Sequence, residues 1–369
     1  MKKGILYIAT FPPPIHGSAM VSEYIKNSCL ANSSFNGDYI NLGTSRKMDE
    51  IGKGGLLLNF KKLCRFVCSL SKTFWLLLMH KYDLCYCAIT CYGTGFLKDA
   101  PFVLLCKLFR RKVVIHQHNK GMSRCVEKQP YKWLLPLVYN NTKVILLSWY
   151  LYPDIEKVVK ENQVLICPNG IPEIFNDEPH FERKNKVPHL LFLSNLIPSK
   201  GVYVLLDACK ILKDKGYEFV CDFVGGESKE ITRDVFEKAC DDRNLNERVF
   251  YHGPMYGNKK NEFFKNANIF VFPTYNETFG LVNLEAMQYK LPIVTTNEGG
   301  IPDIVKDGEN GFVCKREDPI TLADALEKLI TNPNLCREMG DKGYLRYKED
   351  FTLSAFEQNF VDVINRCCK

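Results

Sequence analysis

Two glutamates with seven residues between them, Glu277 and Glu285, stand in the part of the chain richest in groups able to do chemistry. This part follows a buried apolar run, Ile269 to Phe272, and passes through a polar turn into a helix. Backbone amides at the positive end of that helix would suit a phosphate. The alternative is that Glu277 only complements the helix dipole and that Glu285 is a solvated surface charge. The amides concerned belong to Phe279, Gly280 and Leu281.

A lysine stands in a similar setting earlier in the second half. Lys200 lies in a polar turn that leads from an apolar run into a helix over Val202 to Leu212, and a cation placed there could meet a diphosphate. A lone lysine in such a turn is usually a solvated surface charge. Asn195, five residues before it, can donate a hydrogen bond but supplies no charge.

The first half offers weaker candidates. Strand alternation puts His116 and His118 on one face of a predicted strand, and only His118 would reach the strand's carboxyl end. Gly17 lies in a proline-rich turn before a helix, where its missing Cβ allows close backbone approach and the helix end favours an anion. Taken alone, these residues fit a core histidine and a plain strand-to-helix turn better than a ligand site.

The elements that must position these residues are short apolar runs separated by helical patterns. Such runs indicate parallel strands covered on both faces, and the pattern occurs twice, so we expect an α/β protein with two doubly wound domains. In the first half the predicted strands span Gly4 to Thr10, Asp38 to Leu42, Leu84 to Thr90, Lys112 to His118, Lys143 to Ser148 and Gln163 to Pro168. In the second half they span His189 to Asn195, Phe219 to Gly225, Arg248 to Gly253, Asn268 to Pro273, Leu291 to Thr296 and Gly311 to Cys314.

The domain boundaries follow from a polar stretch between the two sets of strands. We expect a first domain over residues 1–180, a linker near Asn176 to Pro188 and a second domain over residues 187–350. The last helix, in residues 352–369, is apolar on one face only, so we expect it to pack back on the first domain. Parallel sheets bind ligands at the carboxyl ends of their strands, so two facing domains would place a substrate cleft between them.

Composition supports a globular protein of about two domains, since 369 residues exceed the roughly 150 residues of a typical one. Residues 1–180 carry 23 Lys and Arg against 13 Asp and Glu, whereas the rest carries 26 against 29. A basic half suggests a phosphorylated substrate, an anionic membrane or a nucleic acid, but no zinc-finger or RNA-binding signature accompanies it. The sixteen cysteines form no metal-site pattern, so we expect free, buried thiols in a reducing cytoplasm.

One segment of the first half alternates apolar and basic residues. No apolar run reaches the roughly 18 residues of a membrane span, and Arg65 and Lys72 interrupt the longest one. The segment Lys61 to Met79 is therefore either a core helix with a cationic exposed side or an interfacial helix that docks on anionic lipid.

Several motifs together resemble glycosyltransferase family 4, whose members are retaining sugar-nucleotide enzymes of the GT-B fold, two Rossmann-like domains facing a central cleft. The spacing E-x-F-G-L-x-x-x-E-A-M is similar to the family's two-glutamate signature. The other similar segments, in family order, are Pro168 to Ile171, Phe192 to Gly201, Glu298 to Asp303 and Asp307 to Gly311. The resemblance spans most of the chain and is strongest in the second half.

The resemblance implies a role for each candidate. The second domain would hold the nucleotide, with Glu285 on the ribose and Lys200 on the diphosphate. Glu277 and the amides of residues 279–281 would hold the sugar and its phosphate. His118, matching a family histidine near the donor sugar, and Gly17, near the donor phosphates or the acceptor, would close the site from the first domain. Ser148, at the end of the next predicted strand, would be a nearby helper. Asn195 stands where the family commonly has arginine, and His16 replaces the first glycine of the family's P-P-x-x-G-G loop.

The resemblance also implies an activity. The enzyme would move a sugar from a nucleoside diphosphate, UDP rather than GDP, to a hydroxyl of a glycan or lipid-linked acceptor, with no metal or other cofactor and no nucleic acid partner. We expect it in the cytoplasm, peripheral on the inner face of the membrane, making capsule, lipopolysaccharide or another bacterial surface polysaccharide. The alternatives are a sugar-nucleotide epimerase of the same fold and a non-catalytic membrane-associated scaffold.

Overall fold

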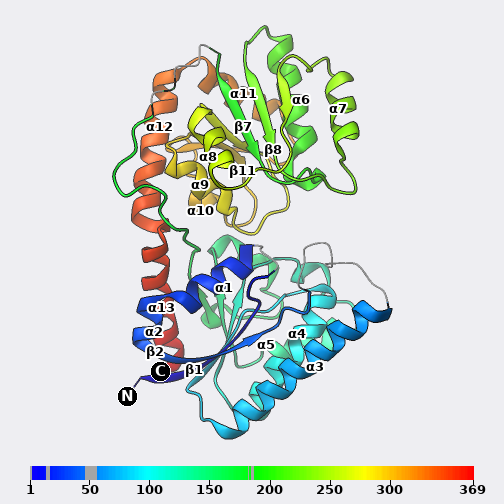
Figure 1. Ribbon diagram of the computed structural model, residues 1–369, viewed down its shortest axis with the longest axis vertical. Coiled ribbons are helices and arrows are strands. Elements are labelled where there is room, and N and C mark those ends of the chain that lie inside the picture. Colours follow the sequence, from blue (N-terminus) through cyan, green and yellow to red (C-terminus); the bar gives the residue numbers. More distant parts are fainter. Residues whose placement is uncertain (1, 14–16, 46–55, 182, 184–186) are drawn as a thin grey trace. The chain divides into compact units, whose positions relative to one another are not determined.

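The computed structural model describes residues 2–13, 17–45, 56–181, 183 and 187–369, and it contains two six-stranded parallel sheets (Figure 1). The chain divides into two compact units, Met1–Asn169 with Leu353–Lys369 and Gly170–Thr352. Strand order is β2-β1-β3-β4-β5-β6 in the first sheet and β12-β11-β10-β7-β8-β9 in the second. The predicted pair of doubly wound α/β domains is confirmed.

Every predicted strand has a counterpart, because buried β-branched and aromatic runs pair most readily inside a sheet. In the first sheet the strands are β1 (Lys3–Ala9), β2 (Phe35–Asn41), β3 (Leu84–Cys87), β4 (Val113–Gln117), β5 (Lys143–Leu146) and β6 (Val164–Ile166). In the second they are β7 (His189–Leu193), β8 (Val220–Val224), β9 (Val249–Tyr251), β10 (Ile269–Phe272), β11 (Ile293–Thr296) and β12 (Gly311–Cys314).

Helices cover both faces of the first sheet (Figure 1). One face is covered by α1, α2 and α13, whose apolar side chains share a core with Tyr7 and Tyr86. In α13 the contributing residues include Phe356, Phe360 and Ile364, so the last helix packs on the first unit as its one-faced pattern predicts. The helices of this unit are α1 (Gly17–Asn27), α2 (Cys29–Ser34), α3 (Leu56–Met79), α4 (Gly93–Leu108), α5 (Tyr131–Tyr139) and α13 (Leu353–Cys368).

The segment from residue 170 to residue 181, which we had expected to close the first domain and begin the linker, groups with the second unit. The Gln288 side-chain amide holds it there, donating to the Pro172 carbonyl (3.2 Å) and accepting from the Ile174 amide (2.8 Å). The Phe175 ring packs on Tyr289, 5.2 Å between ring centroids. The polar composition of this segment predicts a free linker. The contacts with Gln288 and Tyr289 join residues more than a hundred positions apart, so no local sequence pattern shows them.

The second unit has its own set of helices, and its strand order shows where a ligand would sit. Order reverses between β7 and β10 in this sheet, and between β1 and β3 in the first; ligands of such sheets bind beside the carboxyl ends of the strands at that point. The helices are α6 (Val202–Asp214), α7 (Arg233–Asp241), α8 (Gly257–Asn266), α9 (Leu281–Gln288), α10 (Ile301–Ile304), α11 (Pro319–Ile330) and α12 (Pro333–Arg346).

The cysteines and the long helices complete the description. All sixteen cysteines are free thiols, as predicted, and most are buried, but Cys29, Cys64 and Cys68 are exposed, which the expectation of burial did not foresee. In the described residues, no helix combines the length and the apolar composition that crossing a bilayer requires.

Candidate active site

The structure brings Lys200 and Glu277 together at the point where strand order reverses in the second sheet. Lys200 ends a short turn after β7, and Glu277 follows β10, the neighbouring strand. The Lys200 Nζ atom lies 2.8 Å from Glu277 Oε2 and donates a second hydrogen bond to the Asn276 carbonyl at 3.1 Å. Both side chains are about one-fifth exposed, at 20% and 22%, so the pair is sheltered yet open to a ligand.

The two loops are fixed to each other by backbone contacts. The Ser199 carbonyl accepts hydrogen bonds from the Tyr275 amide (2.9 Å) and the Thr274 hydroxyl (3.0 Å). Gly201, which follows the lysine, has a φ of +85°, and a Cβ there would lie 2.1 Å from the Pro273 carbonyl oxygen. A glycine is therefore required after Lys200 for its loop to approach the end of β10.

The Glu277 carboxylate also caps its own loop. Its Oε1 atom accepts from the amides of Thr278 (2.8 Å) and Phe279 (3.4 Å), just before α9 begins. We had expected the Phe279 amide to be open to a phosphate, and in the structure it is occupied by this carboxylate. An anion at this helix end would meet the negative charge of Glu277, whereas sugar hydroxyls could donate to it.

A buried glutamate that the sequence analysis did not select holds the Glu277 loop from behind. Glu298, only 1% exposed, accepts the Glu277 amide at 3.2 Å with one oxygen and binds Arg316 Nη1 at 2.8 Å with the other. The following Gly299 lies so close that a Cβ would be 2.3 Å from the Glu277 carbonyl oxygen. The one available signal was a glutamate between a buried strand and two glycines; its arginine partner lies eighteen residues further on.

The other two candidates of this unit already have protein partners. Glu285, on α9, forms an ion pair with Lys260 of α8 at 2.6 Å, and its side chain is 27% exposed. Asn195 accepts the Gly226 amide at 3.0 Å with its Oδ1 atom, which ties the loop after β7 to the loop after β8. Contact of either with a nucleotide stays a prediction.

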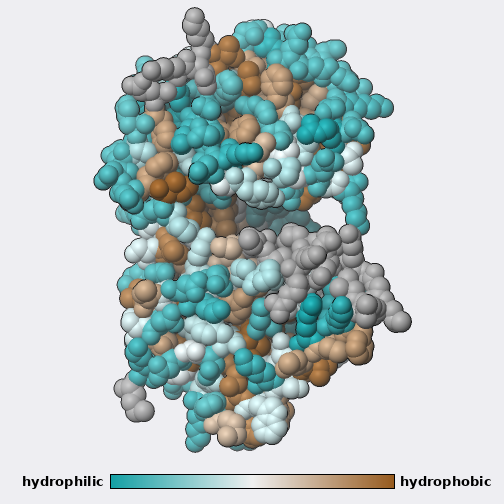
Figure 2. Space-filling view, viewed as in Figure 1, coloured by the Kyte–Doolittle hydropathy of each residue, from teal (hydrophilic) through white to brown (hydrophobic). Residues whose placement is uncertain are grey.

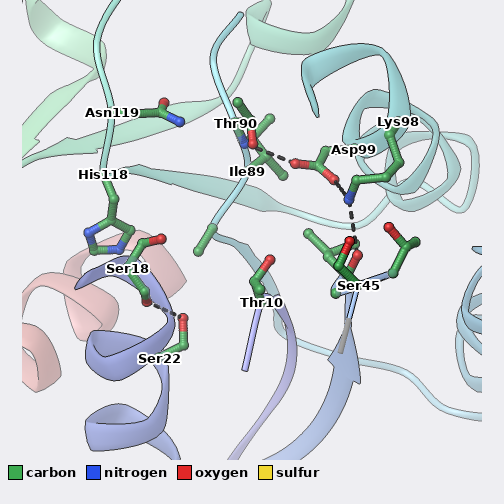
Figure 3. Close-up of a pocket in the computed structure, with 14 residues that line it drawn as sticks. Thr10, Ser18, Ser22, Ser45, Ile89, Thr90, Lys98, Asp99, His118 and Asn119 are labelled. Atoms are coloured by element: carbon green, nitrogen blue, oxygen red, sulfur yellow. Dashed lines mark hydrogen bonds and ion pairs between the residues drawn. The ribbon is translucent and has the colours of Figure 1, made fainter. Parts of the chain in front are cut away.

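The first unit has a cavity of about 250 Å³ at the carboxyl ends of its strands, with both polar and apolar lining residues (Figure 3). Residues that follow β1, β2, β3 and β4 line it, on both sides of the point where strand order reverses. Hydroxyl groups are frequent in its wall, which suits a ligand that both donates and accepts hydrogen bonds. The polar lining residues include Thr10, Ser18, Ser22, Thr44, Ser45, Thr90, Lys98, Asp99, His118 and Asn119.

His118 lines this cavity, while His116 lies behind it on the same face, with the two ring centroids 4.0 Å apart. The alternation predicted for the two histidines is confirmed. Both ring nitrogens of His118 are buried and have no hydrogen-bond partner in the described part of the chain. Burial lowers the pKa of His118 to about 4, so its imidazole is neutral near pH 7 and can donate one hydrogen bond and accept another.

A second residue missed by the sequence analysis organises the cavity. Asp99, 3% exposed, accepts the Thr90 amide at 3.0 Å with one oxygen and forms an ion pair with Lys98 through the other. Lys98 also donates to the Leu42 carbonyl at 3.0 Å. The pair therefore joins the loops after β2 and β3, and it was hidden because Lys-Asp in a helix looks like ordinary surface charge.

The remaining candidates of the first unit are less informative. Gly17 is the first residue of α1 and is exposed, and residues 14–16, including His16, lie outside the described residues. Ser148 is buried and its hydroxyl accepts the Tyr150 amide at 3.0 Å, a capping contact. Among the described residues, no group of three or more His, Cys, Asp or Glu side chains is placed to hold a metal ion.

Comparison with known proteins shows which family the second half of the chain resembles. Residues 173–346 match the family described as Glycosyl transferases group 1. The capsular polysaccharide biosynthesis glycosyltransferase CapM of Staphylococcus aureus is 29% identical over 247 residues, which cover 63% of each chain. The aligned parts span 63%, 54% and 33% of three curated relatives, less than two thirds of each.

Solved structures resemble the whole chain at low sequence identity. Sucrose-phosphate synthase from Thermosynechococcus elongatus has a TM-score of 0.74 at 18% identity, covering 99% of both chains. HepE of Anabaena, in complex with UDP and glucose, has a TM-score of 0.72 at 16% identity, covering 99% of this chain and 100% of its own. The chain therefore has the GT-B fold, and its residues 173–346 match the group 1 glycosyl transferases.

Proposed function

We propose that the protein is a retaining glycosyltransferase that moves a sugar from a nucleoside diphosphate, UDP rather than GDP, to a hydroxyl of a glycan or lipid-linked acceptor. The observation that carries the proposal is the Lys200–Glu277 pair, 2.8 Å apart at the strand-order reversal of the second sheet. A cation and a hydrogen-bond acceptor meet there at the place where sheets of this kind bind nucleotides.

The chemical difficulty of such a transfer is the departure of a diphosphate from the anomeric carbon. Stabilising that negative charge is the main catalytic need, and in this proposal the Lys200 ammonium supplies it. Glu277 accepts hydrogen bonds from the sugar, and Glu285 exchanges its contact with Lys260 for the ribose hydroxyls. Turning Glu277 toward the sugar would also release the amides of Thr278 and Phe279, which it now occupies.

The acceptor side of the proposal uses the cavity of the first unit. The neutral imidazole of His118, with two buried nitrogens and no protein partner among the described residues, would hydrogen-bond a sugar hydroxyl. The acceptor oxygen forms its bond on the face from which the diphosphate leaves, which retains configuration, and the departing diphosphate takes the acceptor's proton. The proposal includes no protein nucleophile and no metal ion.

Similar proteins support the proposed donor and the proposed pathway. HepE is described in complex with UDP and glucose, which favours a UDP-sugar donor here, and CapM is named for capsular polysaccharide biosynthesis. We propose that this protein likewise builds a bacterial surface polysaccharide, such as capsule or lipopolysaccharide, from the cytoplasmic face of the membrane as a peripheral protein.

Donor turnover by the purified protein tests the proposal. UDP- and GDP-sugars are supplied with EDTA present, to the wild type, to Lys200→Ala and Glu277→Ala, and to Lys210→Ala as a control from an exposed ion pair on α6. We expect one UDP-sugar to be consumed despite EDTA, with a loss of at least about 100-fold in both site variants and no change in the control. Conversion of the donor to a second sugar nucleotide without acceptor would indicate an epimerase. No turnover and no nucleotide binding would indicate a scaffold.

A further inference from the structure

The helix α3 turns a row of large apolar side chains toward solvent (Figure 2). They are between 41% and 71% exposed, and the period of 3.6 residues places them along one side of the helix. In Figure 2 brown atoms gather at the edge of the first unit where Figure 1 draws α3. The residues are Phe60, Leu63, Val67, Phe74, Trp75, Leu78 and Met79.

The side of α3 that faces the protein is, by contrast, partly polar. Arg65 donates to the Thr44 carbonyl at 2.6 Å, and Ser69 donates to the Asn41 carbonyl at 3.0 Å. A surface helix normally buries its apolar side and exposes its polar side. α3 does bury Leu77 and packs Phe66 on Phe102, but it also carries large apolar side chains on its outer side, and packing within the unit does not explain these.

The neighbouring helix α4 extends this apolar surface. Leu97 and Leu108 are exposed, the latter by 75%, and an open groove of about 690 Å³ runs between the two helices. We call these residues and the exposed row of α3 the α3–α4 face. Contiguous apolar surface of this kind on a folded protein marks a place where something binds. The groove is lined by Leu70, Ser71, Phe74, Trp75, Pro101, Leu104, Leu105 and Leu108.

Charge identifies the occupant. From residue 56 to residue 112 the chain has ten Lys and Arg but only two acidic residues, Asp83 and Asp99, and Asp99 is buried against Lys98. Lys61 and Lys72 on α3 and Arg110, just after α4, are exposed, and Lys72 also donates to the Tyr39 carbonyl at 3.4 Å. An apolar surface together with exposed cations fits the headgroup and acyl boundary of an anionic bilayer, where the aliphatic and aromatic groups enter and the cations meet lipid phosphates.

We propose that the α3–α4 face docks the protein on the surface of a bilayer that contains anionic lipids. The inference deepens the membrane location included in the proposed function, but its test does not depend on catalysis. Native thiols report on it directly: Cys64 and Cys68 are exposed on the outward side of α3, and Cys29, in α2 of the same unit, is an exposed control.

The first experiment measures how fast a water-soluble maleimide labels each thiol, followed by mass spectrometry of the peptides. Vesicles of phosphatidylglycerol and phosphatidylcholine should slow labelling of Cys64 and Cys68 about tenfold or more and leave Cys29 unchanged, and added salt should weaken this protection. Equal protection by pure phosphatidylcholine vesicles would overturn the choice of an anionic surface. Protection without vesicles, rising with protein concentration, would assign the face to a second copy of the chain and overturn the proposal.

A matched pair of double variants gives the second experiment. Trp75→Ser with Leu78→Ser removes two exposed groups of the face, and Ile320→Ser with Leu345→Ser removes two that are 63% exposed in the second unit. Sedimentation with anionic vesicles should fall about tenfold or more for the first pair only. Donor turnover in solution should stay at the wild-type rate in both, so a failure of docking and a failure of the glycosyltransferase proposal are distinguishable. Unchanged sedimentation of the first pair would overturn the inference.

Discussion

A buried carboxylate organises the ligand edge of each sheet in the same way. In the first unit, Asp99 accepts the amide of Thr90 and pairs with Lys98; in the second, Glu298 accepts the amide of Glu277 and pairs with Arg316. In both units one oxygen fixes the loop after a strand at the strand-order reversal, and the other oxygen is neutralised by a basic side chain. We call each buried carboxylate with its loop amide and its basic partner a frame. The two frames have the same contacts, although their carboxylates lie in different places, Asp99 within α4 and Glu298 in the loop after β11.

What the two frames hold is different. The second unit presents a charged pair, Lys200 and Glu277, and a nearby pair of Glu285 with Lys260, so a ligand there must replace one charge contact by another. The first unit presents hydroxyls and the neutral imidazole of His118, whose nitrogens have no partner in the described residues. In the first unit the charges of Lys98 and Asp99 are paired with each other, and the other polar lining residues are uncharged. A lysine and a glutamate open to a ligand suit a diphosphate, and neutral hydrogen-bonding groups suit hydroxyl groups, as the proposed transfer requires.

The largest expected effect comes from Gly201→Ala, which disrupts the close contact between the Lys200 loop and the end of β10 in the second unit. A Cβ at 2.1 Å from the Pro273 carbonyl oxygen cannot be accommodated by a side-chain movement, and the φ of +85° adds backbone strain. The steric clash and the backbone strain together predict a loss of about 2–5 kcal/mol in the free energy of unfolding. We also expect donor turnover to become undetectable, because the Lys200 loop is displaced.

Gly216→Ala is the matched control for Gly201→Ala. Gly216 has nearly the same φ, +86°, and nothing lies within 4 Å of its added Cβ. Chemical denaturation should show a loss of about 1 kcal/mol, with donor turnover retained. Equal losses in both variants would show that the approach of the two loops contributes nothing beyond backbone strain.

The next effect comes from neutralising each buried carboxylate in turn, which tests whether the two units have different roles. Glu298→Gln keeps an acceptor for the Glu277 amide but removes the charge that holds Arg316, so we expect kcat/KM for donor hydrolysis to fall about tenfold, or about 1.4 kcal/mol. Asp99→Asn makes the equivalent change in the first unit. We expect it to lower transfer to an acceptor while leaving donor hydrolysis unchanged. If Asp99→Asn instead lowers hydrolysis as much as Glu298→Gln, the division between a donor edge and an acceptor edge is wrong.

The two edges also differ in how far the sequence predicts them. The strands, the loops that carry Lys200 and Glu277, and the return of the last helix follow from apolar periodicity and local motifs. The pairing of Glu298 with Arg316 does not, because the two residues meet only once β11 and β12 lie side by side. In the first unit the sequence points to His118 and to the turn before Gly17, but not to the cavity, because residues after four separate strands build it.

A smaller effect tests whether the His118 imidazole is neutral in the folded protein. Burial lowers the pKa of His118 to about 4, whereas an unfolded histidine titrates near 6.5. Between these values the unfolded chain binds the proton and the folded chain does not, so this group lowers the stability as pH falls from about 6.5 to about 4. In His118→Asn, denaturation followed from pH 7 to pH 4.5 should lose less stability than in the wild type. An unchanged pH dependence would mean that the pKa of His118 is the same in the folded and the unfolded protein, as for a freely solvated side chain.

The smallest expected effect comes from adding a positive charge at Asn195, beside the Lys200 loop of the second unit. Asn195→Arg adds a cation beside the loop of Lys200, but it also removes the Oδ1 atom that accepts the Gly226 amide at 3.0 Å. Asn195→Ala removes that hydrogen bond without adding charge, at a cost of about 1 kcal/mol in stability. Calorimetric titration with UDP should therefore show weaker binding by Asn195→Ala and binding several-fold tighter by Asn195→Arg than by Asn195→Ala. Since the two variants share the lost hydrogen bond, the difference between them measures the effect of the added guanidinium side chain. Equal affinities would mean that this side chain does not reach the diphosphate.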